Sequence, residues 1–248
     1  MEHETSYQWE GNMPSDRSIR FGNRQEAGQA LAATLLPFAA SHPLILALPR
    51  GGVPVAFEVA KALGADMDLL FVRKIGSPGD EEYGFGAVVD GAMPQIVLDE
   101  AYVRDFGIDE ETIKGIVTRQ LAEIDRQRRL YAKDRRPVPV TGRVVIVVDD
   151  GVATGGTMRA ALRALRKNRP ARLVLAVPVA APESVATLGA ECDQVVCLSQ
   201  PQPLHAVGAY YRDFSPVEDA EVIRLVAEAH DLRRHRTTGG INWYSEAI

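Results

Sequence analysis

Two adjacent carboxylates, Asp149 and Asp150, stand between an apolar run and a loop rich in glycine and threonine. The run Val144–Val148 contains no polar residue, which indicates a strand buried on both faces of a parallel sheet. Carboxylates at the end of such a strand are good acceptors for hydroxyl groups. The loop at residues 151–157 can turn several backbone N–H groups towards one point, which makes a site for an anion.

A helix is expected directly after this loop, because apolar residues recur there at helical spacing: Met158, Ala161, Leu162 and Leu165. The loop amides then lie at a helix N-terminus, where the helix dipole favours negative charge. Hydroxyl acceptors beside a phosphate site suit a phosphorylated sugar. The alternative is an ordinary strand-to-helix turn with two capping acids. A P-loop is excluded, because no Gly-Lys-Ser/Thr sequence follows the strand.

The segment resembles the signature of the type I phosphoribosyltransferases, in which two acids and a few variable residues precede Thr-Gly-x-Thr. In that family the acids bind the ribose hydroxyls of phosphoribosyl diphosphate, and the loop holds its 5-phosphate. The resemblance implies that Asp149 and Asp150 bind the ribose and belong to the catalytic residues. The residues that it implies for the phosphate are Ala153, Thr154, Gly155, Gly156 and Thr157.

A second loop, Pro49-Arg50-Gly51-Gly52, separates an expected strand at 44–48 from an expected helix at 53–63. It resembles the diphosphate-binding loop of the same family, in which glycines let the backbone approach the ligand. The resemblance implies that all four residues bind substrate and that Arg50 is a catalytic cation. In family members this loop often carries a strained, sometimes cis, non-proline peptide, for which Pro49–Arg50 or Arg50–Gly51 is the candidate here. The alternative is a plain glycine turn.

A polar, glycine-rich stretch at residues 74–84 follows a strand expected at 67–73. In many family members the matching region is a flexible lid that closes over the diphosphate and excludes water. The resemblance implies that Lys74 is a catalytic cation of this lid and that Arg73 is a substrate-binding partner. For each of the two residues, the alternative is a solvated strand end.

The family binds its acceptor under a variable hood, for which residues 204–214 are the candidate. Tyr210, Tyr211 and Phe214 would stack on a planar ring, while His205 and Arg212 would contact its edge. The alternative is that these aromatic side chains pack against the edge of the sheet.

The resemblance implies Mg²⁺-dependent transfer of a phosphoribosyl group from phosphoribosyl diphosphate to a nitrogenous, heterocyclic acceptor, with release of diphosphate. Mg²⁺ would be held mostly by the substrate, with Asp149 acting through water and no protein ligand assigned. The family's 6-oxopurine salvage enzymes carry an aspartate where this chain has Ala153, which disfavours that substrate class. A sensor of phosphoribosyl diphosphate or nucleotides and a hydrolase of phosphoribosyl diphosphate stay open as alternatives.

Strands that alternate with helices predict an α/β fold with an open, mostly parallel sheet and helices on both faces. Ligands bind such sheets at the carboxyl ends of the strands, so both loops are expected to face one site. The resemblance adds a small hood and the lid. Other expected features are helices at 24–39 and 109–131, a hairpin around Asp90-Gly91, and a helix opened by a capping box at 215–218.

The chain is divided into a flexible N-terminal tail at 1–16, a domain at 17–235 and a C-terminal tail at 236–248. Its net charge of −5 argues against a general nucleic-acid binder. The apolar runs are too short to span a membrane, and the N-terminus lacks the apolar segment of a signal peptide, so a cytoplasmic location is expected. The resemblance implies a homo-oligomer, commonly a dimer.

Overall fold

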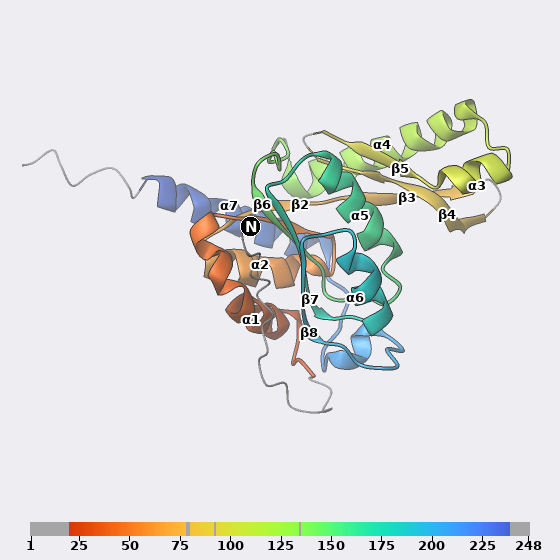
Figure 1. Ribbon diagram of the computed structural model, residues 1–248. Coiled ribbons are helices and arrows are strands. Elements are labelled where there is room, and N and C mark those ends of the chain that lie inside the picture. The colour runs from red at the N-terminus through yellow and green to blue at the C-terminus, as the bar shows by residue number, and fades with distance from the viewer. Residues whose placement is uncertain (1–19, 78–79, 92, 134, 239–248) are drawn as a thin grey trace, which may run out of the picture.

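The computed structural model describes residues 20–77, 80–91, 93–133 and 135–238 (Figure 1). Its larger sheet has five parallel strands in the order β2-β1-β6-β7-β8. These strands are β1 (Leu44–Ala47), β2 (Asp66–Leu69), β6 (Val144–Val148), β7 (Arg172–Val179) and β8 (Gln194–Ser199). The N-terminal tail predicted at 1–16 lies outside the described residues.

Helices cover both faces of this sheet (Figure 1). The core on one side includes residues of α1 (Arg24–Leu35), α2 (Gly52–Leu63), α4 (Glu110–Ala132) and α7 (Asp219–Thr238), and the core on the other side includes residues of α5 (Gly156–Lys167) and α6 (Pro182–Gly189). Ile45 and Ile146 belong to the first core, whereas Leu46 and Val147 belong to the second. Successive strand residues therefore point to opposite faces, and the predicted α/β fold is confirmed.

A smaller antiparallel sheet contains β3 (Val72–Ser77), β4 (Asp80–Val89) and β5 (Gln95–Leu98). Two predictions of secondary structure in this region were wrong. The strand expected at 67–73 is interrupted at Leu70 and Phe71, where the chain passes from one sheet to the other, and most of the loop expected at 74–84 forms strands. The register shifts around Gly76, and such irregularities let a glycine-rich polar segment pair with a neighbouring strand. The hairpin around Asp90-Gly91 is confirmed.

A buried arginine connects the two sheets. Arg128 of α4 donates from Nε to Asp90, just after β4, at 2.7 Å, and its Nη1 lies 3.5 Å from Asp68 of β2. Burial raises the pKa of Asp90, although the charge of Arg128 opposes this shift. These contacts give Arg128 a structural role.

Two helix boundaries differ from prediction. The helix expected at 24–39 changes at Leu36 into the 3₁₀ helix η1 (Leu36–Ser41), because Pro37 offers no backbone N–H. The hydrogen bonds of the described residues include none between Ser215 and Glu218 of the kind a capping box requires, and the Ser215 hydroxyl donates to Asp213 at 2.6 Å. Helix α7 consequently begins later, at Asp219, and it continues to Thr238, beyond the predicted boundary of the domain. The remaining short helices are α3 (Glu100–Asp105) and η2 (Val207–Tyr210).

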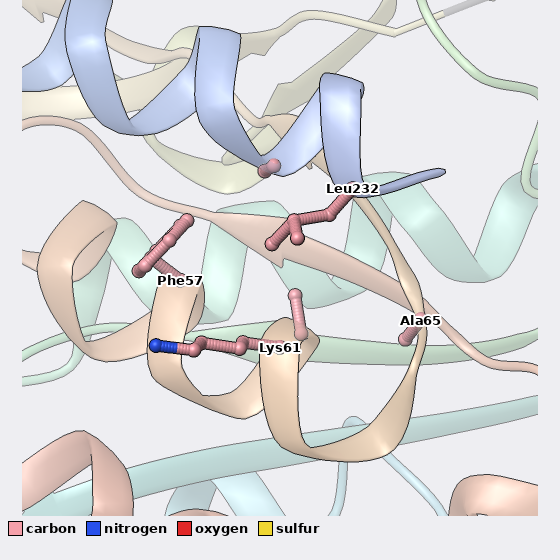
Figure 2. Close-up of a pocket in the computed structure, with 6 residues that line it drawn as sticks. Phe57, Lys61, Ala65 and Leu232 are labelled. Atoms are coloured by element: carbon pink, nitrogen blue, oxygen red, sulfur yellow. The ribbon is translucent and has the colours of Figure 1, made fainter. Parts of the chain in front are cut away.

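A shallow hollow lies between the second half of α2 and α7 (Figure 2). Its lining is Phe57, Ala60, Lys61, Ala65, Ala229 and Leu232. Helix α2 begins at the carboxyl edge of β1 and runs away from it, so the hollow lies towards the other edge of the sheet. No helix in the described part of the chain is long and apolar enough to cross a membrane.

The close packing of α1 on α2 gives a stability prediction. A Cβ atom at Gly28 of α1 would lie 2.7 Å from the Val55 carbonyl oxygen, so we expect Gly28→Ala to lower the unfolding free energy by about 1–3 kcal/mol. Gly115→Ala is the matched control, because that position in α4 is exposed and has open space around it. Alanine there should raise stability by up to about 1 kcal/mol, since it favours helix. Urea unfolding measures both, and equal effects would contradict this packing.

Candidate functional site

The pairing of β1 with β6 brings the two predicted loops together. Ala47 pairs with Val148 at the carboxyl ends of these strands, and the next backbone N–H, that of Leu48, donates to the Val148 carbonyl at 3.0 Å. A Cβ atom at Gly51 would lie 2.1 Å from Oδ2 of Asp150, so only glycine lets the first loop approach the acidic pair this closely. The loops therefore meet at one edge of the sheet.

The helices that open from these loops leave their first amides without a side-chain cap. The N-cap of α2 is Gly51 and that of α5 is Gly155, and neither supplies a capping hydrogen bond. Asn23, Asp99 and Asp109 do cap α1, α3 and α4. The amides of Gly52 and Val53 in α2 donate to the Leu48 and Arg50 carbonyls, so α2 contributes mainly its dipole. The uncapped amides of α5, together with its dipole, form a favourable site for a phosphate group.

The loop before α5 is held by its neighbours. Val152 exchanges backbone hydrogen bonds with the segment after β7, with its N–H 2.9 Å from the Val179 carbonyl oxygen. The Ser184 hydroxyl donates to the Ala153 carbonyl at 2.6 Å. Gly155 takes a left-handed conformation with φ 75°, which turns the chain into α5. Ala153, Thr154 and Gly156 are exposed, and Thr157 is partly buried. The loop has a fixed shape and an accessible surface.

Two neighbouring carboxylates in a partly buried position, those of Asp149 and Asp150, are electrostatically unfavourable. Both side chains are partly buried, and Oδ1 of Asp149 accepts the backbone N–H of Asp150 at 2.9 Å. Burial, followed by the neighbouring charge of Asp150, raises the pKa of Asp149 well above its ordinary value. Burial also raises the pKa of Asp150, but the hydrogen bond and charge of Arg24 oppose that shift. The pair is therefore poised to accept donors or a cation.

Arg24 is a residue of this site that the sequence did not reveal. Its Nε donates to Oδ2 of Asp150 at 2.8 Å, although the two residues are 126 positions apart. In the sequence, Arg24 marks only the start of an amphipathic helix. A contact between such distant residues has no local signal.

Arg50 lies at the solvent side of the first loop. Its peptide bond with Pro49, one of the two candidates, is cis. The Arg50 guanidinium is 3.4 Å from Asp219 at the start of α7, and both side chains are about half exposed. The Tyr131 hydroxyl donates to the same carboxylate at 2.7 Å, and burial followed by this bond raises the pKa of Tyr131 to about 12. Arg50 is therefore accessible to a ligand at this edge.

Arg73 and Lys74 lie in strand β3 and not in a loop. Strand β3 begins shortly after β2 ends, so it starts from the carboxyl edge of the larger sheet. The partly buried Arg73 donates from Nε to Gln120 of α4 at 3.1 Å, whereas Lys74 is exposed. Neighbouring residues of a strand point to opposite faces. No hydrogen bond between described residues joins either cation to the acidic pair.

The aromatic residues of the predicted hood pack beside the acids. Tyr211 is buried, its ring lies 5.0 Å from that of Phe214, and its hydroxyl donates to the Asp150 carbonyl at 2.5 Å. Burial raises the pKa of Tyr211, and the charge of Asp150 adds to this shift. Tyr210 and Phe214 are partly buried against the same small core. These aromatic side chains therefore pack at the edge of the sheet, which is the alternative considered above to stacking on a planar ligand.

The carboxylates fit the chemistry of a hard divalent cation. Two partly buried acids face one arginine, Arg24, and their oxygens are suitable ligands for Mg²⁺, directly or through water. Among the described residues, no group of three or more His, Cys, Asp or Glu side chains gathers as a metal site. Asp149 and Asp150 are thus the residues on which a cation at this edge would depend.

Known proteins share this sequence pattern. The sequence model of the family described as "Phosphoribosyl transferase domain" matches residues 24–211. The "Putative phosphoribosyl transferase Rv0571c" of Mycobacterium tuberculosis (strain ATCC 25618 / H37Rv) is 40% identical over 210 residues, which are 85% of this chain and 47% of that protein. The "Bifunctional protein PyrR" of Chloroflexus aurantiacus is 52% identical over 131 residues, which are 52% of this chain and 65% of that protein.

A solved structure has the same fold. The crystal structure of TT1426 from Thermus thermophilus is 43% identical and has a TM-score of 0.72, covering 85% of this chain and 99% of that one. The chain spans about half the length of the Mycobacterium relatives, so the match concerns one part of those proteins.

The raised pKa of Asp149 gives a prediction for stability. A carboxyl group with a raised folded pKa stabilises the fold most below its unfolded pKa, and this contribution is lost as pH rises through the folded pKa. Asp149→Asn keeps an acceptor for the Asp150 amide and removes the charge. We expect it to stabilise the ligand-free protein by about 1 kcal/mol or more near pH 8, with a smaller gain near pH 4.

Thermal unfolding across this pH range, without added divalent cations, measures the effect. Asp105→Asn is the control, because Asp105 is an exposed aspartate of α3, and it should show little change at either pH. A loss of stability for Asp149→Asn at the higher pH would contradict the electrostatic cost assigned to the pair.

Proposed function

The chain belongs to the phosphoribosyl transferase domain family, and from this membership we propose that it transfers the phosphoribosyl group of phosphoribosyl diphosphate to a nitrogenous, heterocyclic acceptor. The observation that carries the proposal is the meeting of the acidic pair with the uncapped N-termini of α2 and α5. Carboxylates accept hydrogen bonds from hydroxyl groups, and the amides bind phosphate. A sugar that carries phosphates offers both kinds of group at once.

The two loops bind the two ends of the substrate in this proposal. Asp149 and Asp150 accept the ribose hydroxyls, and the loop at 153–157 binds the 5-phosphate with its backbone amides. The loop at 49–52 binds the diphosphate, where glycine permits close backbone approach and α2 contributes its dipole. Support comes from the shared edge of β1 and β6, where the acidic pair and the loop at 49–52 lie side by side.

In the reaction, a bond forms between the acceptor nitrogen and the anomeric carbon, while the bond from that carbon to the diphosphate oxygen breaks. The diphosphate leaves with the electron pair, so negative charge grows on it. Arg50 is accessible at the loop and stabilises this charge. Lys74, on the exposed side of β3, is proposed as the other cation of the diphosphate site, and Arg73, on the opposite face beside Gln120, is proposed only as a substrate-binding residue. The rest of the rate enhancement comes from holding the sugar and the acceptor in fixed positions.

Mg²⁺ is proposed as the cofactor, with Asp149 as a contact through water. When bound, it would neutralise part of the charge of the phosphates. The acceptor is proposed to lie under the segment 204–214, with Tyr210, Tyr211 and Phe214 as the aromatic candidates. The protein is further proposed to act in nucleotide metabolism in the cytoplasm, as a homo-oligomer such as a dimer.

A turnover assay tests this function. The protein is incubated with phosphoribosyl diphosphate, Mg²⁺ and a panel of heterocyclic bases, and released diphosphate is measured. We expect release that depends on one of the bases. Release without a base would identify a hydrolase, and tight binding without release would identify a sensor. Either of these results would contradict the transferase proposal.

A variant links binding to the acidic pair. The double substitution Asp149→Asn and Asp150→Asn should weaken the binding of phosphoribosyl diphosphate by at least about 2 kcal/mol, because charged hydrogen bonds are lost. The control with the same change in net charge is Asp105→Asn with Asp125→Asn, since both aspartates are exposed and lie on other helices. Titration calorimetry measures the affinities. Unchanged affinity of the first variant, with its fold intact, would argue against these roles.

A further inference from the structure

We propose that Arg24 is a positioning residue, which holds the Asp150 carboxylate in the orientation that receives a ribose hydroxyl. This inference rests on the proposed function and adds a residue from outside both loops. Arg24 lies in the first turn of α1, and Asp150 follows β6. The contact therefore joins the N-terminal part of the described chain to the acidic pair.

The ion pair is largely shielded from water. The side chain of Arg24 is 11% exposed and that of Asp150 is 15% exposed, and the distance from Nε to Oδ2 is 2.8 Å. Exposed ion pairs contribute little because water and salt screen them, and shielding reduces this screening. A second donor of the guanidinium, Nη1, contacts the Ser215 carbonyl oxygen at 2.8 Å. The two bonds hold the guanidinium between Asp150 and the segment that leads to α7.

Two aromatic rings also lie near the Arg24 guanidinium and restrict its orientation. Its central carbon lies 3.9 Å from the centre of the Phe214 ring and 6.0 Å from that of Tyr211. The Tyr211 hydroxyl in turn donates to the backbone carbonyl of Asp150. Asp150 is thus held by its carboxylate through Arg24 and by its main chain through Tyr211. A planar arginine can stack and donate at once, which a lysine cannot do in the same way.

The segment that carries these rings is itself bound to the start of α1. The N–H of Arg212 donates to the Phe21 carbonyl at 2.9 Å, and the N–H of Asp213 donates to the Gly22 carbonyl at 2.9 Å. Arg24 follows directly in the same stretch of chain. These bonds set the position of the guanidinium before any ligand arrives, which is the requirement for a preorganised site.

The hydrogen bond to Arg24 gives the two carboxylate oxygens of Asp150 different roles. Oδ2 of Asp150 contacts Arg24 and faces Gly51 of the first loop, so we assign the ribose hydroxyl to Oδ1. A hydrogen bond between charged partners is shorter and stronger than one between neutral groups, so this contact fixes the orientation of the carboxylate.

The test compares Arg24→Gln and Arg24→Lys with the wild-type protein and with Arg224→Gln. Arg224 is a matched control, because it makes an exposed pair with Glu228 on α7. Calorimetry measures the affinity for phosphoribosyl diphosphate and, as a probe without ribose hydroxyls, the affinity for inorganic diphosphate. Circular dichroism checks the fold of each variant.

For Arg24→Gln we expect the affinity for phosphoribosyl diphosphate to fall by about tenfold or more, with the affinity for inorganic diphosphate unchanged. A purely structural defect would lower both affinities. Arg24→Lys should recover part of the lost affinity, since it keeps the charge without the planar fork. Arg224→Gln should match the wild-type protein in both measurements.

Three results would overturn the inference. A wild-type affinity for phosphoribosyl diphosphate in Arg24→Gln, or an equal loss of both affinities, would remove the positioning role. Tighter binding by that variant would show that Arg24 blocks the carboxylate. Absence of binding by the wild-type protein would instead reject the proposed function, and with it the ribose role. Should Arg24→Gln fail to fold, Arg24→Lys decides, because full wild-type affinity in this variant contradicts the need for the planar fork.

Discussion

The parallel pairing of β1 with β6 is the constraint on which the candidate site depends. It aligns Ala47 with Val148, so the chain leaves both strands at the same level and on the same edge of the sheet. Gly51 then lies so close to Asp150 that a Cβ atom would collide with the carboxylate. A shift of this register by one residue would turn the side chains to opposite faces and separate the two loops.

Opposite electrostatic features meet at this edge. The amides of α2 and α5 offer partial positive charge without side-chain caps, while the acidic pair brings negative charge into a partly buried position. Burial of the acidic pair costs free energy, because the carboxylates have lost some of their contact with water. A ligand that presents hydroxyl groups to the acids and phosphates to the amides satisfies both. The arrangement thus lowers the stability of the free protein and favours ligand binding, as is common at functional sites.

The parts of the molecule that follow local rules were predictable. The apolar run Val144–Val148, the acids after it and the periodic residues of α5 lie next to one another in the sequence, and the structure confirms both elements. Lys74 was expected in a loop because its neighbours are polar and glycine-rich, but pairing of β3 with β4 overrides that local preference. The contact of Arg24 with Asp150 and that of Arg50 with Asp219 depend on tertiary folding, so no spacing in the sequence indicates them.

We infer that the acidic pair and the adjoining amides together bind a phosphorylated ribose. A crystal structure of the protein with phosphoribosyl diphosphate and Mg²⁺ tests this. We expect ribose hydroxyls within hydrogen-bonding distance of Asp149 and Asp150, with the 5-phosphate on the backbone N–H groups of residues 154–157. A ligand bound elsewhere, or one whose ribose points away from both aspartates, would contradict it.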